Sequence, residues 1–357
     1  MPDLAPADLR AAVAAGVLNE AQAADLQALA AQRLAAKPLP DDEPFELFRG
    51  FSEIFISVGL LILLAGFLGM ATMLGMPVLL LVVGVVVPIV LAWYFTLRRR
   101  MVLPSIVLVT AFAISMAGLI GWFVIDKLQA IEYPRTGGLV ISGLTALALI
   151  GWFRVFRLPF TMFLIGVSGF IFVLFLTNAI NPAMVLKSSG WHDLFDLRGG
   201  SGLAIGTLVF GLLAAAVALA FDMRDPHRLG RLSASAFWLD LVAAPAIVNT
   251  LGLTAMGLEG GARIAALVVS LLIMALYAII IDRRSFLSAG LGYLAWLIWQ
   301  LASQNGSGLS WPQILILIGA SVTALGAWWV PLRGIVMRAL PDFPGKDHLP
   351  PYAKGKP

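Results

Sequence analysis

The chain has 357 residues, of which 60% are hydrophobic and only 12% are charged, and its mean hydropathy is +0.93. Soluble domains carry about 25% charged residues, so this composition excludes a soluble globular fold and predicts an all-α bundle in contact with the lipid bilayer. Cysteine is absent, which excludes disulfides, thiolate metal sites and cysteine nucleophiles. The net charge of +4 is better explained by membrane topology than by nucleic-acid binding.

Residues 1–48 are predicted to form a small cytoplasmic helical hairpin followed by an acidic, proline-rich linker. The first helix, around residues 7–15, ends at Gly16, and Asn19 caps a second helix with Gln22 closing the capping box. Eight acidic side chains against four basic ones, Arg49 included, give this head a charge of −4. Phosphate contact needs a basic surface, so the head predicts no nucleic-acid binding and is a candidate for binding a cytoplasmic protein partner.

Apolar runs long enough to cross a bilayer recur from residue 51 onward, and they define a transmembrane domain over residues 49–335. A cytoplasmic tail follows at 336–357. The hairpin between the first two runs turns only at Gly75, Met76 and Pro77. The ten predicted spans are 51–74, 77–97, 102–125, 137–153, 158–178, 202–221, 233–256, 264–281, 286–303 and 311–332.

The positive charges divide unequally between the two sets of loops that ten spans create. Nineteen of the 24 Lys and Arg residues fall on the side of both termini, and five fall on the other. Cytoplasmic loops retain positive charge, so the division predicts a bacterial inner-membrane protein with both termini in the cytoplasm. The five on the outer side are Lys127, Arg135, Lys187, Arg198 and Arg263.

A resemblance to a known family rests on the head and the first span. Residues 14–24 read Ala-Ala-Gly-Val-Leu-Asn-Glu-Ala-Gln-Ala-Ala, and the first span contains Gly59, Gly66 and Gly69. Over about the first 75 residues, the chain resembles the bacterial family called domain of unknown function two-one-five-seven. The resemblance implies a polytopic membrane protein without an agreed activity, and it supplies no functional residues.

Asp240 is the first candidate site residue, because ionisable groups inside a membrane are costly and often functional. It lies seven residues into the seventh predicted span, roughly 10 Å from the cytoplasmic end of that helix. One interpretation makes it a proton or cation site beside Pro245. The other makes it a structural partner of Arg228 or Arg231.

A second candidate is a polar layer in the seventh and ninth predicted spans. Asn249 and Gln300 both lie roughly 22–24 Å from the inner ends of their helices. They are interpreted either as an amide pair that holds two helices together or as part of a substrate site with Trp296 and Trp299 as its walls.

The remaining sequence patterns are better explained by structural roles than by catalysis or ligand binding. Asp222-Met223-Arg224 is echoed by Asp282-Arg283-Arg284, which indicates either a repeated hairpin or simply two spans with short loops under the positive-inside rule. Further expectations are a Glu53–Arg49 ion pair, a short interfacial helix near 191–198, and close helix packing at four glycines. Those glycines are Gly166, Gly169, Gly202 and Gly206.

Two functional hypotheses from different classes remain open. The first is a secondary transporter or permease for a small or lipidic molecule, and the second is a non-transporting membrane scaffold or sensor whose head binds a protein. An enzyme ranks third, because no catalytic motif, cofactor-binding fingerprint or metal-ligand spacing occurs. The three histidines, His192, His227 and His348, fall in different loops and predict no metal site. The oligomeric state and the substrate are left open.

Overall fold

A computed structural model of the chain describes residues 12, 13, 15–17, 19 and 22 of the head. In the rest of the chain it describes residues 50–127, 134–177, 194–225, 228, 231–304, 311–342 and 345–350. The chain divides into two compact units, Met1–Pro44 and Phe45–Pro357. Within these ranges every regular element is helical, which confirms the all-α class.

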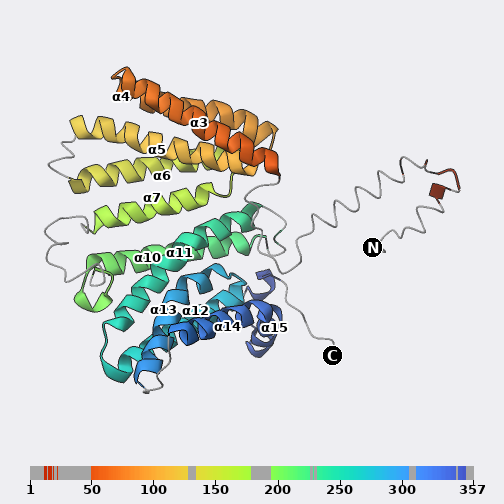
Figure 1. Ribbon diagram of the computed structural model, residues 1–357, viewed down its shortest axis with the longest axis vertical. Helices are drawn as coiled ribbons and strands as arrows, with labels where there is room; N and C mark the ends of the chain where they lie inside the picture. Colours follow the sequence, from red (N-terminus) through yellow and green to blue (C-terminus); the bar gives the residue numbers. More distant parts are fainter. Residues whose placement is uncertain are drawn as a thin grey trace. The chain divides into compact units, whose positions relative to one another are not determined.

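Figure 1 labels the main helices of the second unit, which are given below in chain order. The first set is α3 (Phe51–Met73), α4 (Pro77–Ala92), the π-helix η1 (Trp93–Arg98), α5 (Val102–Lys127), α6 (Pro134–Phe156) and α7 (Thr161–Leu176). The second set is the short 3-10 turn η2 (Leu197–Gly199), α10 (Gly202–Asp222), α11 (Arg231–Met256), α12 (Gly260–Ile281), α13 (Ser285–Gln304), α14 (Trp311–Ala327), α15 (Trp329–Ala339) and η3 (Lys346–His348).

Local sequence signals explain several helix ends. Gly75 adopts a φ of 63°, a left-handed conformation that glycine tolerates, and Pro77 opens α4 at a position where no N–H is needed. This confirms the predicted tight turn between the first two runs. In the head, Asn19 N–H donates to Gln22 Oε1 and Gln22 N–H donates to Asn19 Oδ1, which confirms the predicted capping box. The rest of the predicted hairpin lies outside the described residues.

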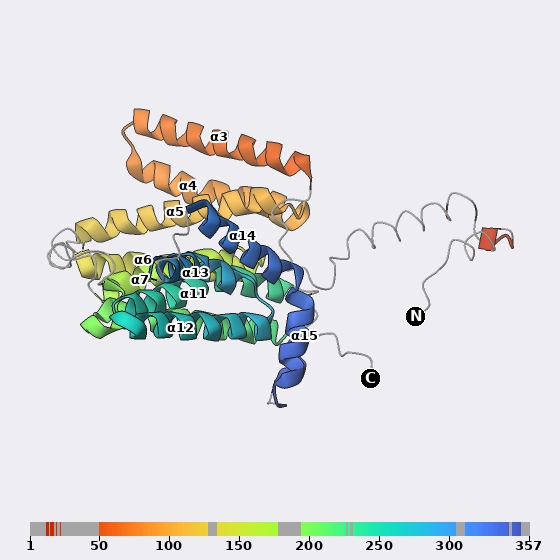
Figure 2. The same cartoon turned by 60° about the horizontal axis from the view of Figure 1, so that its bottom comes forward.

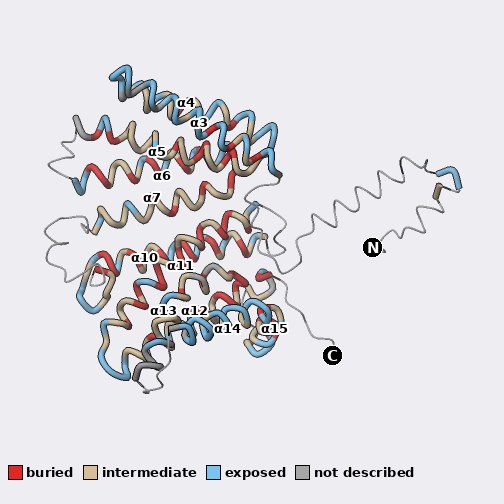
Figure 3. Tube along the Cα trace, in the orientation of Figure 1, coloured by how far each residue is buried: buried red, intermediate tan, exposed pale blue. Residues whose placement is uncertain are grey.

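The helices form two apolar cores that meet at α7. In the first core, Phe112, Trp152 and Phe156 stack closely between α5 and α6. The second core is rich in small side chains and is centred on α11, which packs against α10, α12 and α13. Buried residues recur along α11 from Ser233 to Ala255, as the red segments of this helix in Figure 3 show. Because α7 contacts α6 on one side and α10 and α11 on the other, it joins the two cores.

Six described helices are long and apolar enough to cross a membrane, and large apolar side chains such as Phe55, Ile62 and Leu272 are exposed along the helices. This pattern is that of a membrane protein, because a soluble protein would bury such residues. α7 and the Phe51–Phe67 part of α3 are shorter apolar helices. Every predicted run is helical over most of its length, but the count of ten spans stays a prediction.

Two predicted boundaries are wrong. The fourth run, predicted to be short at 137–153, is a helix of 23 residues from Pro134 to Phe156. The tenth run, predicted to continue to 332, ends at Ala327, and α15 follows at an angle of 67° (Figure 2). α15 leaves the direction of α14 because Trp329 and Arg333 are held by contacts to Asp282 and Ile279 at the C-terminal end of α12.

Candidate functional site

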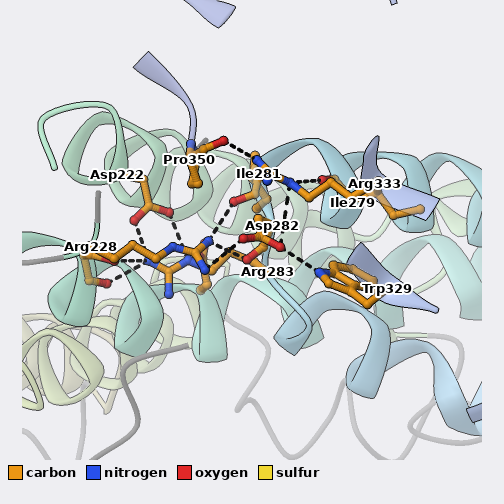
Figure 4. A network of polar contacts seen from close by, with 11 residues as sticks. Asp222, Arg228, Ile279, Ile281, Asp282, Arg283, Trp329, Arg333 and Pro350 are labelled. Atoms are coloured by element: carbon orange, nitrogen blue, oxygen red, sulfur yellow. Dashed lines mark hydrogen bonds and ion pairs between the residues drawn. The ribbon is translucent and has the colours of Figure 1, made fainter. Parts of the chain in front are cut away.

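A buried network of ion pairs lies where α10 ends, α11 begins and α12 turns into α13 (Figure 4). Its centre is Arg283, which is 0% exposed. The Arg283 guanidinium donates to both carboxylate oxygens of Asp222, with Nε 2.9 Å from Oδ2. It also donates to the Ser233 carbonyl at 2.8 Å and to the Ser233 hydroxyl at 3.0 Å. A forked, charge-assisted contact of this kind fixes the relative positions of three helix ends.

Asp240 belongs to the same network. It is 1% exposed, and its Oδ2 lies 3.7 Å from Arg283 Nε. The predicted structural partners were therefore the wrong arginines. Arg228 instead forms an ion pair with Asp282 at 3.1 Å, and the arginine beside Asp240 comes from a turn 43 residues further along the chain. Two carboxylates, those of Asp222 and Asp240, thus share one guanidinium.

Asp282 forms a second centre in the network. Its backbone is left-handed, with a φ of 59°, and it caps the end of α12. Its carboxylate accepts a hydrogen bond from Trp329 Nε1 at 2.7 Å and lies 3.7 Å from Arg333 Nε. Arg333 also donates to the Pro350 carbonyl at 2.6 Å. The network therefore connects α12 to α15 and to the segment that follows it.

The two echoing tripeptides meet in this network. Asp222 of the first and Arg283 of the second are direct partners, and Asp282 of the second binds Arg228 a few residues after the first. The sequence had indicated the similarity of the two motifs but not their contact. Opposite charges at the ends of two apolar helices on the same predicted side of the membrane were the signal that could have suggested it.

Asn249 lies nine residues beyond Asp240 on α11 and belongs to another region. Its Oδ1 accepts a hydrogen bond at 3.0 Å from Tyr293 on α13. Trp296 is half-buried and Trp299 is 45% exposed on α13. The side chain of Gln300 lies outside the described part of the structure, so the predicted amide layer remains a prediction. Asp240 and Asn249 are not brought together.

A cavity of about 270 Å³ lies between α7, α10 and α11. Its walls are mainly aromatic and aliphatic, and its polar lining side chains are Thr207 and Asn249. Asp240 does not line it. No sequence pattern indicated this cavity, because it depends on how three helices pack. Pro245, which was noted only as a neighbour of Asp240, is one of its lining residues.

Glu53 has a different role from the predicted pair with Arg49, which lies outside the described residues. Glu53 is buried, and its Oε2 accepts hydrogen bonds at 3.1 Å from the backbone N–H groups of Val102 and Leu103. These groups are at the start of α5, where helix N–H groups have no helical partner. A carboxylate from α3 thus caps α5, which no local pattern could indicate.

Close packing is confirmed at three of the four predicted glycines, Gly166, Gly169 and Gly206. A Cβ on Gly206 would lie 2.9 Å from Val173 and Thr177, and one on Gly166 would lie 3.2 Å from Val242. A Cβ on Gly169 would lie 3.0 Å from Phe210, whereas one on Gly202 would lie 3.8 Å from Thr177, which is an ordinary van der Waals distance. These approaches allow α7 to pack tightly against α10 and α11.

The described residues contain no group of His, Asp and Glu side chains that could hold a metal ion. His192 and His227 lie outside those residues, and His348 is exposed. Of the predicted interfacial helix near 191–198, the described part is a turn in which Asp196 caps η2. Comparisons with protein-family models, with curated proteins and with solved structures found no match to this chain.

Proposed function

We propose that this chain is a ten-span protein of the bacterial inner membrane, with both termini in the cytoplasm, that acts as a secondary transporter or permease for a small or lipidic molecule. Several long apolar helices make it an integral membrane protein. The resemblance of its first 75 residues to domain of unknown function two-one-five-seven is part of the same proposal.

The observation that carries the proposal is the position of Asp240. It is a carboxylate within an apolar helix, almost fully buried, and it shares Arg283 with a second carboxylate. A buried charge inside a membrane helix is costly, so chains that contain one commonly use it to bind a proton or another cation.

The two carboxylates are held unequally by Arg283. Asp222 receives two hydrogen bonds from the guanidinium, whereas Asp240 Oδ2 lies at 3.7 Å, outside hydrogen-bond distance. A proton on Asp240 would therefore leave the hydrogen bonds between Arg283 and Asp222 in place and weaken the attraction between α11 and the α12–α13 turn. Tyr277 of α12 is a further titratable group near both carboxylates. This is the arrangement that coupling of proton binding to helix movement requires.

The proposed topology also has support. The structure brings the ends of α10 and α12 and residues of α15 together in one network, whereas Arg198 contacts the Gly257 carbonyl beyond the opposite end of α11. Arg228, Arg283 and Arg333 therefore gather at the same end of the bundle, and under the positive-inside rule this supports a cytoplasmic face there.

The alternative is a rigid scaffold or sensor, and the extent of the network favours it. Asp222, Asp240 and Asp282 face Arg228, Arg283 and Arg333, so the formal charges balance across the ends of five helices. In a scaffold these contacts would only hold the bundle together, and the pH would not change its conformation.

The transporter and the scaffold can be distinguished by how the labelling rate of one engineered cysteine changes with pH. The chain is free of cysteine, so Val167→Cys on the wall of the cavity provides a single reactive thiol in reconstituted vesicles. For a proton-coupled transporter, maleimide labelling corrected for thiol reactivity should rise as the pH falls, because protonated Asp240 loosens α11. Adding Asp240→Asn should keep labelling high at every pH, with little change in Tm.

The exposed Asp342 serves as a matched control, and Asp342→Asn should leave the pH response intact. A labelling rate that does not change with pH, together with a large fall in Tm for Asp240→Asn, would reject transport and establish the scaffold.

A further inference from the structure

The cavity between α7, α10 and α11 has an apolar end and a polar end. Phe163 and Leu241 lie at the apolar end. The polar end is formed by Phe195, Thr207 and Asn249. Seven residues separate Phe163 from Phe170 on α7, and eight separate Leu241 from Asn249 on α11, so the cavity extends roughly 10–12 Å along the helices. Its polar end is on the side of η2, which is the predicted outer side.

Thr207 provides a buried hydroxyl at the polar end. Its side chain is 0% exposed, and its Oγ1 has no hydrogen-bond partner within the described ranges. Several helical threonines donate to the carbonyl four residues earlier, as Thr250 does to Ala246 at 2.8 Å. The hydroxyls of Thr145 and Thr161 also lack a partner among the described residues, but they do not line the cavity. A buried hydroxyl without a partner is costly, and a ligand group that hydrogen-bonds to it recovers that cost.

α11 contributes two more polar groups. Pro245 has no N–H, so the carbonyl of Leu241 lacks its usual helical donor. Asn249 is held through its Oδ1 by Tyr293, which leaves the two N–H donors of its amide for another acceptor. Donors and acceptors are therefore both present along one wall of an otherwise apolar cavity.

The lining and the size restrict the ligand. No charged side chain lines the cavity, so a charged head group would lose its hydration without gaining a counter-ion. A volume of about 270 Å³ lies near the lower limit for ligand pockets, which suits one hydrocarbon chain and not the body of a two-chain lipid.

We propose that this cavity binds a single-chain amphiphile with an uncharged, hydrogen-bonding head, such as a fatty alcohol or a monoacylglycerol. The head lies at Thr207 and Asn249, and the chain runs past Pro245 towards Phe163. As the substrate site of a permease the cavity rests on the proposed function, but binding itself is independent of transport.

The test uses the full chain in lipid nanodiscs and a dodecanol analogue with a photoreactive diazirine at the end of its chain. Mass spectrometry should locate the crosslinks near Phe163 and Leu241, and unlabelled monolaurin should compete. Thr207→Val removes the hydroxyl and keeps nearly the same side-chain shape. It should raise the probe concentration that gives half-maximal labelling by about threefold to tenfold. The matching dodecanoate analogue, which carries a charge, should label poorly.

A filling variant and its control complete the design. Val167→Phe on the cavity wall should abolish the specific crosslinks, whereas Val209→Phe on an exposed face of α10 should not. Crosslinks scattered over lipid-facing helices and unchanged by Val167→Phe would overturn the site. Equal labelling by dodecanoate would overturn the uncharged head. Normal labelling with no pH response in the Asp240 experiment would reject transport alone and leave the binding site standing.

Discussion

Arg283 and Asp222, 61 residues apart in the sequence, form a doubly hydrogen-bonded ion pair that is closed to solvent. The pair connects the end of α10 to the turn between α12 and α13. Ser233, at the start of α11, accepts two more hydrogen bonds from the same guanidinium. One arginine thus fixes the relative positions of three helix ends, so the C-terminal half of the bundle depends strongly on it.

The first prediction concerns the stability that this pair provides. Asp222→Asn should destabilise the protein by about 3–5 kcal/mol, because it removes the main counter-charge of a buried arginine. The fall in Tm of the detergent-solubilised protein measures the effect. The control is Asp342→Asn, which removes a fully exposed carboxylate paired with Lys346 and should leave the Tm unchanged.

A double variant tests the same interpretation from the other side. The background is Asp240→Asn, which removes the second carboxylate beside Arg283. In this background, Arg283→Met combined with Asp222→Asn should recover part of the stability lost on adding Asp222→Asn alone, since neither an uncompensated guanidinium nor an uncompensated carboxylate of this group remains. Strictly additive losses would mean that the two residues act independently, contrary to the contact seen in the structure.

The network also shows where prediction from the sequence fails. Asp240 was identified because a carboxylate in an apolar run is conspicuous, and an interfacial arginine was expected beside it. The choice between arginines was wrong because local spacing favours Arg228 and Arg231, whereas tertiary packing brings in Arg283 from the α12–α13 turn. The charge pattern predicts that a buried charged side chain has a partner, but it does not identify a partner that is far away in the sequence.

The second prediction concerns the cap that Glu53 places on α5. Glu53→Ala should cost about 0.5–2 kcal/mol, because two N–H groups at the helix start lose their acceptor in a buried position. The matched control is Glu259→Ala, since Glu259 precedes α12, is exposed and makes no capping hydrogen bond. Equal Tm values for the two variants would contradict the capping role.

Local signals account for most of the fold that could be predicted. The Asn19–Gln22 capping box, the turn at Gly75 and the close approaches at Gly166 and Gly206 each follow from a short stretch of sequence. The bend at Trp328 could not be predicted, because the apolar run continues through it. It depends on α15 contacts to residues at the end of α12, and hydropathy contains no information about such contacts.

The third prediction tests how closely α10 and α11 approach. A Cβ on Gly211 would lie 2.7 Å from Ile247 Cγ1 and 3.2 Å from the Ile247 backbone nitrogen. Backbone cannot yield as a side chain does, so Gly211→Ala should destabilise the bundle by about 1–3 kcal/mol. Gly151→Ala is the control, because no atom lies within 4 Å of a Cβ there, and its Tm should stay level or rise slightly.

The last prediction concerns topology and again uses the absence of cysteine. Single cysteines replacing the exposed residues Arg224 and Ala339 should not react with a membrane-impermeant maleimide added to intact cells, because the proposal places them in the cytoplasm. Cysteines replacing Gly199 and Glu259 should react, and permeabilised cells should label all four. Labelling on the same side for Arg224 and Gly199 would contradict a membrane crossing by α10, which joins them. Reversal of all four would preserve the alternation of the helices and overturn only the orientation inferred from the arginine loops.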